Sequence, residues 1–324
     1  MAETVDALAA PDAALARAVA VLAEGLPVAI PTETVYGLAA DATRAEAIAR
    51  IYEVKGRPRF NPLISHVSSM AMAERHGVFD PLSRALAEAF WPGPLTLVLP
   101  RADTSTVHDL ATAGLSTLGL RMPDGIARAI IDGVGRPLAA PSANTSGGVS
   151  PTEAGHVAAD LGRRIPLIVD AGPCAVGLES TIVKVEGDAI RLLRPGGLEA
   201  AAIEAVAGRP LQRPAQAGAA IEAPGMLASH YAPDATLRLD AEDVRPGEAL
   251  IRFGGRRLPG EAQARLVLDL SPAGSLREAA AHLFAYLKRA DASGAGRIAV
   301  GPIPQDGLGE AIRDRLKRAA APRP

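Results

Sequence analysis

The sequence predicts an α/β protein with an open twisted mixed sheet, followed by a second, smaller α/β unit. Over the first two hundred residues, short apolar runs alternate with segments of helical periodicity, as is typical of a sheet covered by helices. Two abutting strands at 180–185 and 189–193, joined by "EGD", predict an antiparallel hairpin within that sheet. Between Gly208 and Pro233 neither apolar strand-like runs nor helical periodicity is present, and proline, glycine and alanine dominate. We therefore expect three parts, namely residues 1–207, a linker over 208–233, and a small α/β unit over 234–324.

The individual elements follow from apolar runs bounded by turn residues and from helical spacing. In the first part, strands are expected at 27–30, 62–67, 95–99, 116–122, 137–140, 166–170 and 180–185, and helices near 12–24, 43–54, 80–90, 124–131, 151–160 and 199–206. In the last part, strands are expected at 235–240, 248–253, 264–270 and 297–303, with helices near 275–290 and 308–319. Thr43 with Glu46, and Ser150 with Glu153, match the capping-box pattern at two helix starts.

Composition limits the class of protein. The chain has 324 residues, 48% of them hydrophobic, a net charge of −2 and 3% aromatic residues, which argues against broad electrostatic binding or base stacking of nucleic acid. No stable nucleic-acid binding is therefore expected. A single cysteine, Cys174, excludes a disulfide framework, and no apolar run is long enough to span a membrane. With an acidic rather than basic N-terminal stretch, a cytoplasmic location is the expectation.

Several familiar nucleotide and hydrolase motifs are absent. No lysine precedes Ser or Thr, so there is no Walker A loop, and no G-x-G-x-x-G follows a strand. G-x-S-x-G and H-E-x-x-H are missing too. A nucleotide bound here must be held by side chains and scattered turns.

A basic cluster lies at the end of the second predicted helix, in "EVKGRPRFNPLISH". Lys55, Arg57 and Arg59 fall within five residues, which suits either a solvated helix C-terminus or, because Gly56 and Pro58 break the helix among them, an anion site. His66 ends the following strand, where a histidine alone is more often structural than a ligand.

A second candidate is the strand "STLGLRM". Thr117 and Arg121 are four residues apart, so both side chains project from one face. Arg121 needs a partner in apolar surroundings. That partner is either an internal carboxylate, Asp124 or Asp132, or a substrate carboxylate or phosphate held by both guanidinium nitrogens.

Polar residues follow two more strands. "APSANTSGGVSPT" brings hydroxyls, backbone amides and a helix start to the end of a short strand, which suits a phosphate as well as an ordinary loop. In "GLESTIVKV" and "LLRPGGL", Glu179 can cap or pair locally and Arg194 can be an ordinary turn arginine.

Seven ordered segments resemble the YrdC-type threonylcarbamoyl-AMP synthases. They are "PTETVYGL", "KGRPRFNPL", "FWPGPLTLVL", "LRMPDG", "APSANTSG…SPT", "ESTIV" and "LRPGGL", and "APGMLASHYAP" resembles the linker of the long, two-domain subtype. The resemblance implies an open twisted sheet with a concave basic cavity, a linker that closes over it, and a Rossmann-like C-terminal domain. It implies that L-threonine, bicarbonate or CO2, and ATP give threonylcarbamoyl-AMP and pyrophosphate. The product would pass to the machinery that modifies tRNA.

The same resemblance implies site residues. Threonine would be held by Thr34, His66, Arg121, Ala140 and Ser180. ATP would be held by Lys55, Arg57, Asn61, Thr117, Ser142, Asn144, Ser150, Arg194 and Tyr231, with Lys55 and Arg57 positioning the nucleotide. Mg2+ would arrive on the phosphates without protein ligands, and no general base or nucleophile is expected.

Within "PTETVYGL", Thr34 is expected to line the threonine pocket and Gly37 to turn the chain sharply before the next helix. Two rival functions differ from this assignment. An RNA-binding module would spread basic residues over a face, whereas here they are concentrated at strand ends. A hydrogenase-maturation enzyme with a YrdC-like domain would carry zinc-finger cysteines, which this chain lacks.

Overall fold

A ten-stranded mixed sheet forms the first unit, and the predicted fold class is confirmed. The computed structural model describes residues 1–213, 222–225 and 229–322. The strand order is β1-β8-β2-β3-β7-β4-β6-β5-β9-β10. These strands are β1 (Glu3–Asp6), β2 (Val28–Pro31), β3 (Tyr36–Asp41), β4 (Ile64–His66), β5 (Leu95–Pro100), β6 (Thr117–Arg121), β7 (Leu138–Ala139), β8 (Leu167–Asp170), β9 (Thr181–Glu186) and β10 (Ala189–Arg194).

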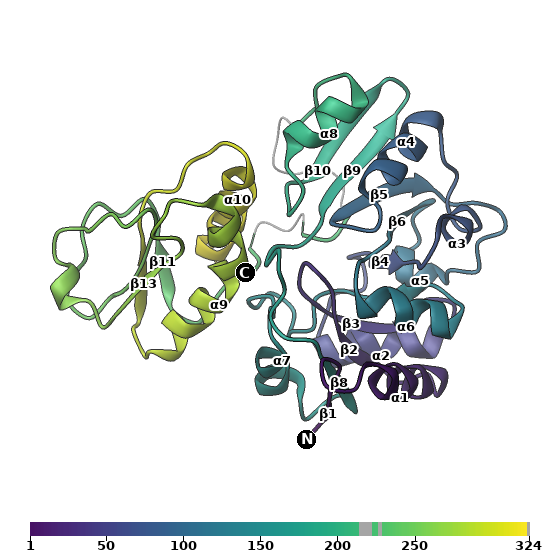
Figure 1. The fold of residues 1–324 in the computed structure, drawn as a ribbon, viewed down its shortest axis with the longest axis horizontal. Coiled ribbons are helices and arrows are strands. Elements are labelled where there is room, and N and C mark those ends of the chain that lie inside the picture. Colours follow the sequence, from purple (N-terminus) through teal and green to yellow (C-terminus); the bar gives the residue numbers. More distant parts are fainter. Residues whose placement is uncertain (214–221, 226–228, 323–324) are drawn as a thin grey trace.

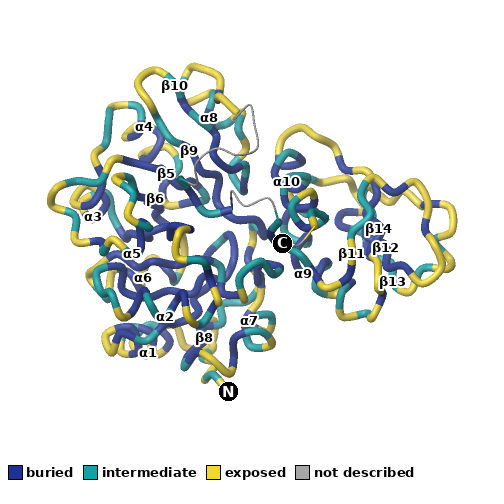
Figure 2. Tube along the Cα trace, turned by 180° about the vertical axis from the view of Figure 1, so that it is seen from behind, coloured by how far each residue is buried: buried dark blue, intermediate teal, exposed yellow. Residues whose placement is uncertain are grey.

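Eight helices accompany this sheet in the described part of the chain. They are α1 (Pro11–Ala23), α2 (Ala45–Lys55), α3 (Met70–Glu74), α4 (Pro81–Phe90), α5 (Asp109–Thr112), α6 (Ile126–Val134), α7 (Ala154–Leu161) and α8 (Ala200–Ala207). Helix α1 packs on α6 and on strands β1, β2, β3 and β8, while α4 packs on β5 and α8. Strands β2, β3, β4 and β7 in the middle of the sheet are accordingly buried along their length (Figure 2). The predicted hairpin is present as the antiparallel pair β9–β10.

The second unit is a four-stranded parallel sheet with the order β11-β14-β12-β13. Its elements are β11 (Thr236–Arg238), β12 (Ala249–Arg252), the 3-10 turn η1 (Glu261–Gln263), β13 (Leu266–Asp269), α9 (Leu276–Ala292), β14 (Arg297–Val300) and α10 (Leu308–Ala320). Helices α9 and α10 lie between this sheet and the first unit (Figure 1). The described residues include no helix long and apolar enough to cross a membrane.

One apolar cluster is shared by the two units. Val35, Val149 and Leu178 of the first unit pack with Tyr231 and with the buried faces of α9 and α10. The backbone of the first unit comes close to α9 at Gly177, where a Cβ would lie 2.4 Å from the Cα of Ala281. Part of the contact between the two units is therefore apolar.

Two helix starts differ from the capping-box prediction, which was wrong at both. Helix α2 begins after Arg44 and has no side-chain cap, because the Thr43 hydroxyl instead donates to Asp41. Helix α7 begins after Glu153, also uncapped by a side chain. Ser150 lies before that helix and is fully buried, so its hydroxyl serves another partner, described below.

The segment around Gly37 also differs from the prediction of a sharp turn. The chain reverses at residues 32–35, and Tyr36–Asp41 forms strand β3, antiparallel to β2. Gly37 lies inside β3 and bridges to Ser142. A Cβ at Gly37 would lie 3.3 Å from the Cβ of Ala140, so glycine is needed there for close approach to the 140–142 loop.

Candidate functional site

A cavity of about 520 Å³ opens where several strands of the first unit end. Strands β4, β6 and β10 contribute residues at their ends. The loops after β2 and β7, the loop before β9 and the chain that leads into the second unit complete the wall. The lining residues are Val35, Arg57, Ile64, His66, Arg121, Ala140, Pro141, Ser142, Glu179, Ser180, Arg194, Pro224, Gly225, His230 and Tyr231.

Two arginines in this wall are buried without a carboxylate partner in the described part of the chain. Arg57 donates to the backbone carbonyls of Asn61 (3.2 Å) and Pro62 (2.8 Å). Arg194 donates to the carbonyl and hydroxyl of Ser180. Burial lowers the pKa of Arg57 to about 10, so the group stays charged near neutral pH. A buried guanidinium that bonds to no carboxylate is costly, and an anion in the cavity would relieve that cost.

Arg121 is the third arginine of the cavity, and its internal partner is Glu33. Its Nη2 lies 2.6 Å from Glu33 Oε1, and its Nε donates to the carbonyl of Gly93. Of the two alternatives for Arg121, an internal pair with Asp124 or Asp132 is not formed: Asp132 accepts from Ser68, and the Asp124 amide donates to Glu33. The ion pair fixes the guanidinium plane, as a clamp for a carboxylate requires.

His66 and Ser180 lie close to these arginines in the cavity wall. Burial, reinforced by the charge of Arg121, lowers the pKa of His66 to about 3, so its ring is neutral at physiological pH. Its Nδ1 is buried and has no partner among the described residues. The hydroxyl of Ser180 lies 2.7 Å from that of Thr96. The wall here offers neutral polar groups beside a fixed cation.

The 140–148 loop is held in place by Lys55 beneath it. Lys55 is buried, and its Nζ donates to the carbonyls of Ser142 (2.6 Å) and Asn144 (2.5 Å). Burial, with the nearby charge of Arg57, lowers the pKa of this lysine well below its ordinary value. Of these residues Ser142 reaches the cavity, whereas Lys55 and Asn144 support it from behind.

The expected site residues thus divide into two groups. Eight of them line the cavity: Arg57, His66, Arg121, Ala140, Ser142, Ser180, Arg194 and Tyr231. Six lie outside its lining: Thr34, Lys55, Asn61, Thr117, Asn144 and Ser150. Thr34 is buried with its hydroxyl 2.8 Å from that of Thr32, and its neighbour Val35 lines the cavity instead. Thr117 starts β6 opposite Pro100.

Unpartnered buried atoms gather around this cavity. Within the described part of the chain, seven buried side-chain atoms lack a hydrogen-bond partner, and five belong to residues in or beside the cavity: Asn61 Oδ1, His66 Nδ1, Asn144 Oδ1, His230 Nδ1 and Arg315 Nη2. Native proteins leave few such groups unsatisfied. Their concentration here indicates a polar site built for a ligand.

Several residues in and around the lining could not be assigned from the sequence. Glu33 and Glu179 are ambiguous at that level, because their partners Arg121 and Arg315 lie 88 and 136 residues away along the chain. The only signal for His230 is its unusual place in a linker, and it lines both this cavity and a larger interdomain groove beside α7 and α9. Residues 226–228 of the "APGMLASHYAP" segment lie outside the described residues.

Comparisons with known proteins cover nearly the whole chain. A family model described as "Telomere recombination" matches residues 20–196, and one described as "Threonylcarbamoyl-AMP synthase, C-terminal domain" matches residues 198–321. The threonylcarbamoyl-AMP synthase of Bacillus subtilis is 40% identical, covering 99% of this chain and 97% of its own length. That of Pyrococcus abyssi is 40% identical over 92% of this chain and 91% of its own length.

Solved structures agree with the sequence comparison. The crystal structure of P. abyssi Sua5 complexed with L-threonine superposes with a TM-score of 0.85 at 37% identity, covering 94% of both chains. Escherichia coli YciO, at 18% identity and a TM-score of 0.53, shares the fold of the first unit. The matches extend across both units and the segment between them. This chain therefore belongs to the family of threonylcarbamoyl-AMP synthases, in the form that carries the additional C-terminal domain.

Proposed function

We propose that this protein makes L-threonylcarbamoyl-AMP and pyrophosphate from L-threonine, bicarbonate or CO2, and ATP. The observation that carries the proposal is the pair of buried guanidiniums, Arg57 and Arg194, which face one cavity with no carboxylate partner among the described residues. A third guanidinium, Arg121, is fixed in the same wall. Such a cavity suits one substrate with a carboxylate and another with several phosphates.

Threonine would occupy the side of the cavity near Arg121. Its carboxylate would pair with this guanidinium, which Glu33 and the Gly93 carbonyl hold in one plane. The neutral ring of His66, the Ser180 hydroxyl and the Ala140 backbone would receive the amine and hydroxyl. Thr34 would act through the turn that places Val35 in the wall. A preference for threonine over serine would rest on a methyl pocket, which alone supplies about 1–3 kcal/mol.

ATP would occupy the side near Arg57 and Arg194. Ser142 and Tyr231 also line the cavity, and Asn61, whose backbone carbonyl accepts from Arg57, has an unpartnered Oδ1. Lys55, Asn144 and Ser150 would shape the loop that borders the nucleotide, and Thr117 is kept in the proposed set by family resemblance. The phosphates would thus be held by side chains, in keeping with the absence of a Walker loop.

The chemistry requires little beyond alignment. The threonine amine adds to CO2 and loses a proton to give a carbamate, and a carbamate oxygen attacks the α-phosphorus of ATP. The new bond joins that oxygen to phosphorus, the bond to the bridging oxygen of the β-phosphate breaks, and pyrophosphate leaves. Arg57 and Arg194 would stabilise the charge that grows on the phosphoryl oxygens. No side-chain nucleophile takes part.

Magnesium would arrive with the nucleotide. Glu179 is the carboxylate in the cavity lining, and its two oxygens already accept from Arg315 and Ser150. No cluster of three or more His, Cys, Asp or Glu residues is found in the described ranges. These residues fit an ion held by phosphate oxygens and water, as Mg2+ commonly is.

The product is a mixed anhydride and is therefore labile, so it would pass directly to a transferase that attaches the threonylcarbamoyl group to adenosine in tRNA. We also propose that residues 1–207 form the catalytic unit, that 208–233 act as a linker and lid, and that 234–324 complete the site from outside. Part of that linker, 214–221 and 226–228, lies outside the described residues.

The test is substrate dependence and product mass. Pyrophosphate should be released from ATP only when threonine and bicarbonate are both present, and mass spectrometry should find the mass of threonylcarbamoyl-AMP. Equal pyrophosphate release without threonine would contradict the proposal, as would a product of threonyl-AMP mass.

A further inference from the structure

Arg315 on α10 is the largest fully buried side chain among the described residues, and it reaches from the second unit to the wall of the cavity. Its Nε donates to Glu179 Oε2 at 2.8 Å, and its Nη1 donates to Asp314. Its guanidinium carbon lies 5.1 Å from the centre of the Tyr231 ring, which in turn stacks on Phe284 of α9. One side chain therefore contacts two residues of the cavity lining.

Glu179 presents an electrostatic difficulty for a phosphate site. It lines the cavity together with Arg194, and its other oxygen, Oε1, accepts from the buried Ser150 hydroxyl at 2.5 Å. Burial raises the pKa of Glu179, but the charges of Arg315 and Arg194 and the bond from Ser150 outweigh burial, so the pKa lies below its ordinary value. A buried carboxylate that stays ionised repels phosphate and competes for the arginine beside it.

We propose that Arg315 is a positioning residue for the nucleotide, supplied by the second unit, which neutralises Glu179 and holds Tyr231. With Glu179 paired to Arg315, Arg194 has no carboxylate bond among the described residues and stays available to the phosphates. Arg315 and Phe284 both pack against the Tyr231 ring, whose hydroxyl lies beside Gly225 and near the side chain of Arg194. This inference rests on the ATP site of the proposed function.

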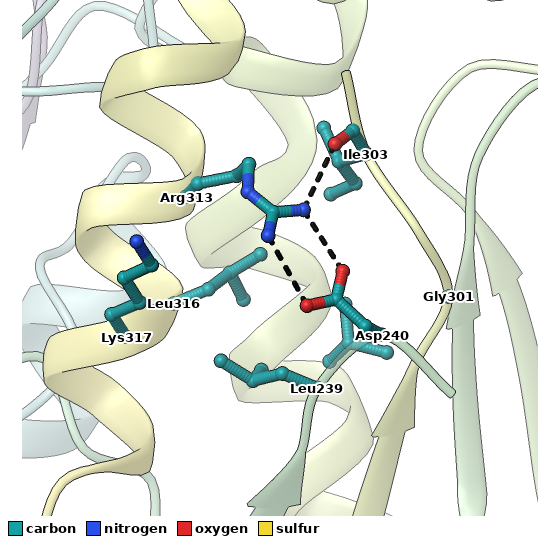
Figure 3. Close-up of a pocket in the computed structure, with 8 residues that line it drawn as sticks. Leu239, Asp240, Gly301, Ile303, Arg313, Leu316 and Lys317 are labelled. Carbon is teal, nitrogen blue, oxygen red and sulfur yellow. Dashed lines mark hydrogen bonds and ion pairs between the residues drawn. The ribbon is translucent and has the colours of Figure 1, made fainter. Parts of the chain in front are cut away.

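Arg313 provides a matched control on the same helix. It donates to both oxygens of Asp240 and to the carbonyl of Ile303, all within the second unit (Figure 3). Arg313→Met removes an arginine and an ion pair from α10 without touching the cavity lining. Its ATP affinity is expected to stay within two-fold of the unmodified protein.

The experiment measures ATP affinity by calorimetry with threonine present, together with the apparent KM for each substrate. Arg315→Met should weaken ATP binding ten-fold or more while the KM for threonine changes less than three-fold. Adding Glu179→Gln to Arg315→Met should recover at least three-fold of the lost affinity, because the uncompensated carboxylate is gone. Arg315→Lys should retain part of the affinity through its charge.

The outcomes distinguish a role of Arg315 in nucleotide binding from a purely structural role. ATP binding by Arg315→Met equal to the unmodified protein overturns the inference, and so does equal impairment of the single and double variants, which would make Arg315 only an anchor between units. If Arg315→Met does not fold, Arg315→Lys and the charge-balanced double variant decide the question by the same comparison. Failure of the unmodified protein to bind ATP would instead overturn the proposed function.

Discussion

At the scale of single residues, the site depends on how each arginine is paired. Arg121 has a carboxylate partner, Glu33, and is thereby oriented, whereas Arg57 and Arg194 bond to carbonyl and hydroxyl oxygens. A guanidinium with a fixed carboxylate suits recognition of one group in one orientation. Guanidiniums with only dipolar partners suit a ligand that brings its own negative charge.

Replacing Arg121 by lysine should weaken threonine binding. Lysine keeps the charge but loses the fork of parallel donors, and a charge-assisted bond of this kind is worth about 1.5–3 kcal/mol. The apparent KM for threonine should rise about ten-fold or more in a pyrophosphate-release assay. Arg17→Lys, at an exposed ion pair with Glu3, is the control and should change nothing. An unchanged threonine dependence in Arg121→Lys would remove this residue from the site.

The neutral ring of His66 should make the protein sensitive to acid. In the unfolded chain this histidine takes up a proton near pH 6.5, but in the fold only near its pKa of about 3. Between these values the unfolded state binds more protons, so stability is lost as the pH falls. At pH 5 the loss from this group should reach about 2 kcal/mol.

The measurement for His66 is denaturant unfolding at pH 7 and pH 5, with His66→Gln as the variant. The difference in unfolding free energy between the two pH values should shrink by about 2 kcal/mol in the variant, even if its stability at pH 7 is lower. An identical difference in both proteins would show that His66 is protonated in the fold at pH 5. His230, whose pKa burial also lowers to about 3, contributes equally to both proteins.

At the scale of elements, the sequence predicted most strands and helices but missed those without a clear pattern. Strand β3 is buried on both faces, so "YGLAAD" shows no alternation and resembles a turn at the level of sequence. Strand β1 is short and largely exposed at the sheet edge, and α3 and α5 are too short for helical periodicity to show. The capping boxes failed because Thr43 and Ser150 found partners in the tertiary fold, Asp41 and Glu179.

Individual residues of the site could be predicted from the sequence, but the hydrogen bonds and ion pairs between them could not. Lys55 and Arg57 stand out because they form a basic cluster at a helix end, and Arg121, Ser142 and Arg194 because each ends or follows an apolar strand. The pairs that organise them join residues far apart, such as Glu179 with Arg315, and no local spacing carries that information. Lys55 shows the same limit, since its carbonyl partners lie 87 and 89 residues further along the chain.

Because the 172–180 segment lies close against α9, replacing Gly177 should strongly lower the free energy of unfolding. Its φ is +73°, and an added Cβ would meet the backbone of Ala280 and Ala281. Gly114 is the matched control, with a φ of +77° and nothing within 4 Å of the place that a Cβ would take. Gly114→Ala should cost about 1–2 kcal/mol for the left-handed backbone alone.

Gly177→Ala should lower the unfolding free energy by the same backbone cost as Gly114→Ala and by about 1–3 kcal/mol more, because the two units must separate slightly to admit the methyl group. Thermal unfolding of both variants measures the difference. Equal costs for the two substitutions would mean that the contact between this segment and α9 is loose in solution.

At the scale of the whole molecule, two ion pairs among the described residues attach α10 to parts of the chain outside the second unit, one to the first unit and one to the linker, and they differ in burial. Arg315 and Glu179 are buried, whereas the side chains of Arg213 and Glu310 are 50% and 29% exposed. Exposed pairs are worth about 0.2–1 kcal/mol and weaken with salt. The number of ion pairs across the contact therefore does not indicate how strongly they stabilise it.

Arg213→Gln should accordingly leave ATP affinity unchanged and lower the unfolding free energy by less than about 1 kcal/mol. Calorimetric ATP titration and denaturant unfolding at low and high salt provide the measurement. A loss of ATP affinity comparable to that expected for Arg315→Met would show that any weakening of the contact between units, and not the pairing of Glu179, controls the nucleotide site.

The apolar cluster that Val35, Val149 and Leu178 share with Tyr231, α9 and α10 bears on how the chain melts. Separate domains usually unfold in separate steps, each with its own heat-absorption peak. Here the melting of either unit would leave the other with an apolar face in water, which makes half-unfolded states unfavourable. A calorimetric scan of the 324-residue chain should therefore show a single heat-absorption peak, because the two units unfold together.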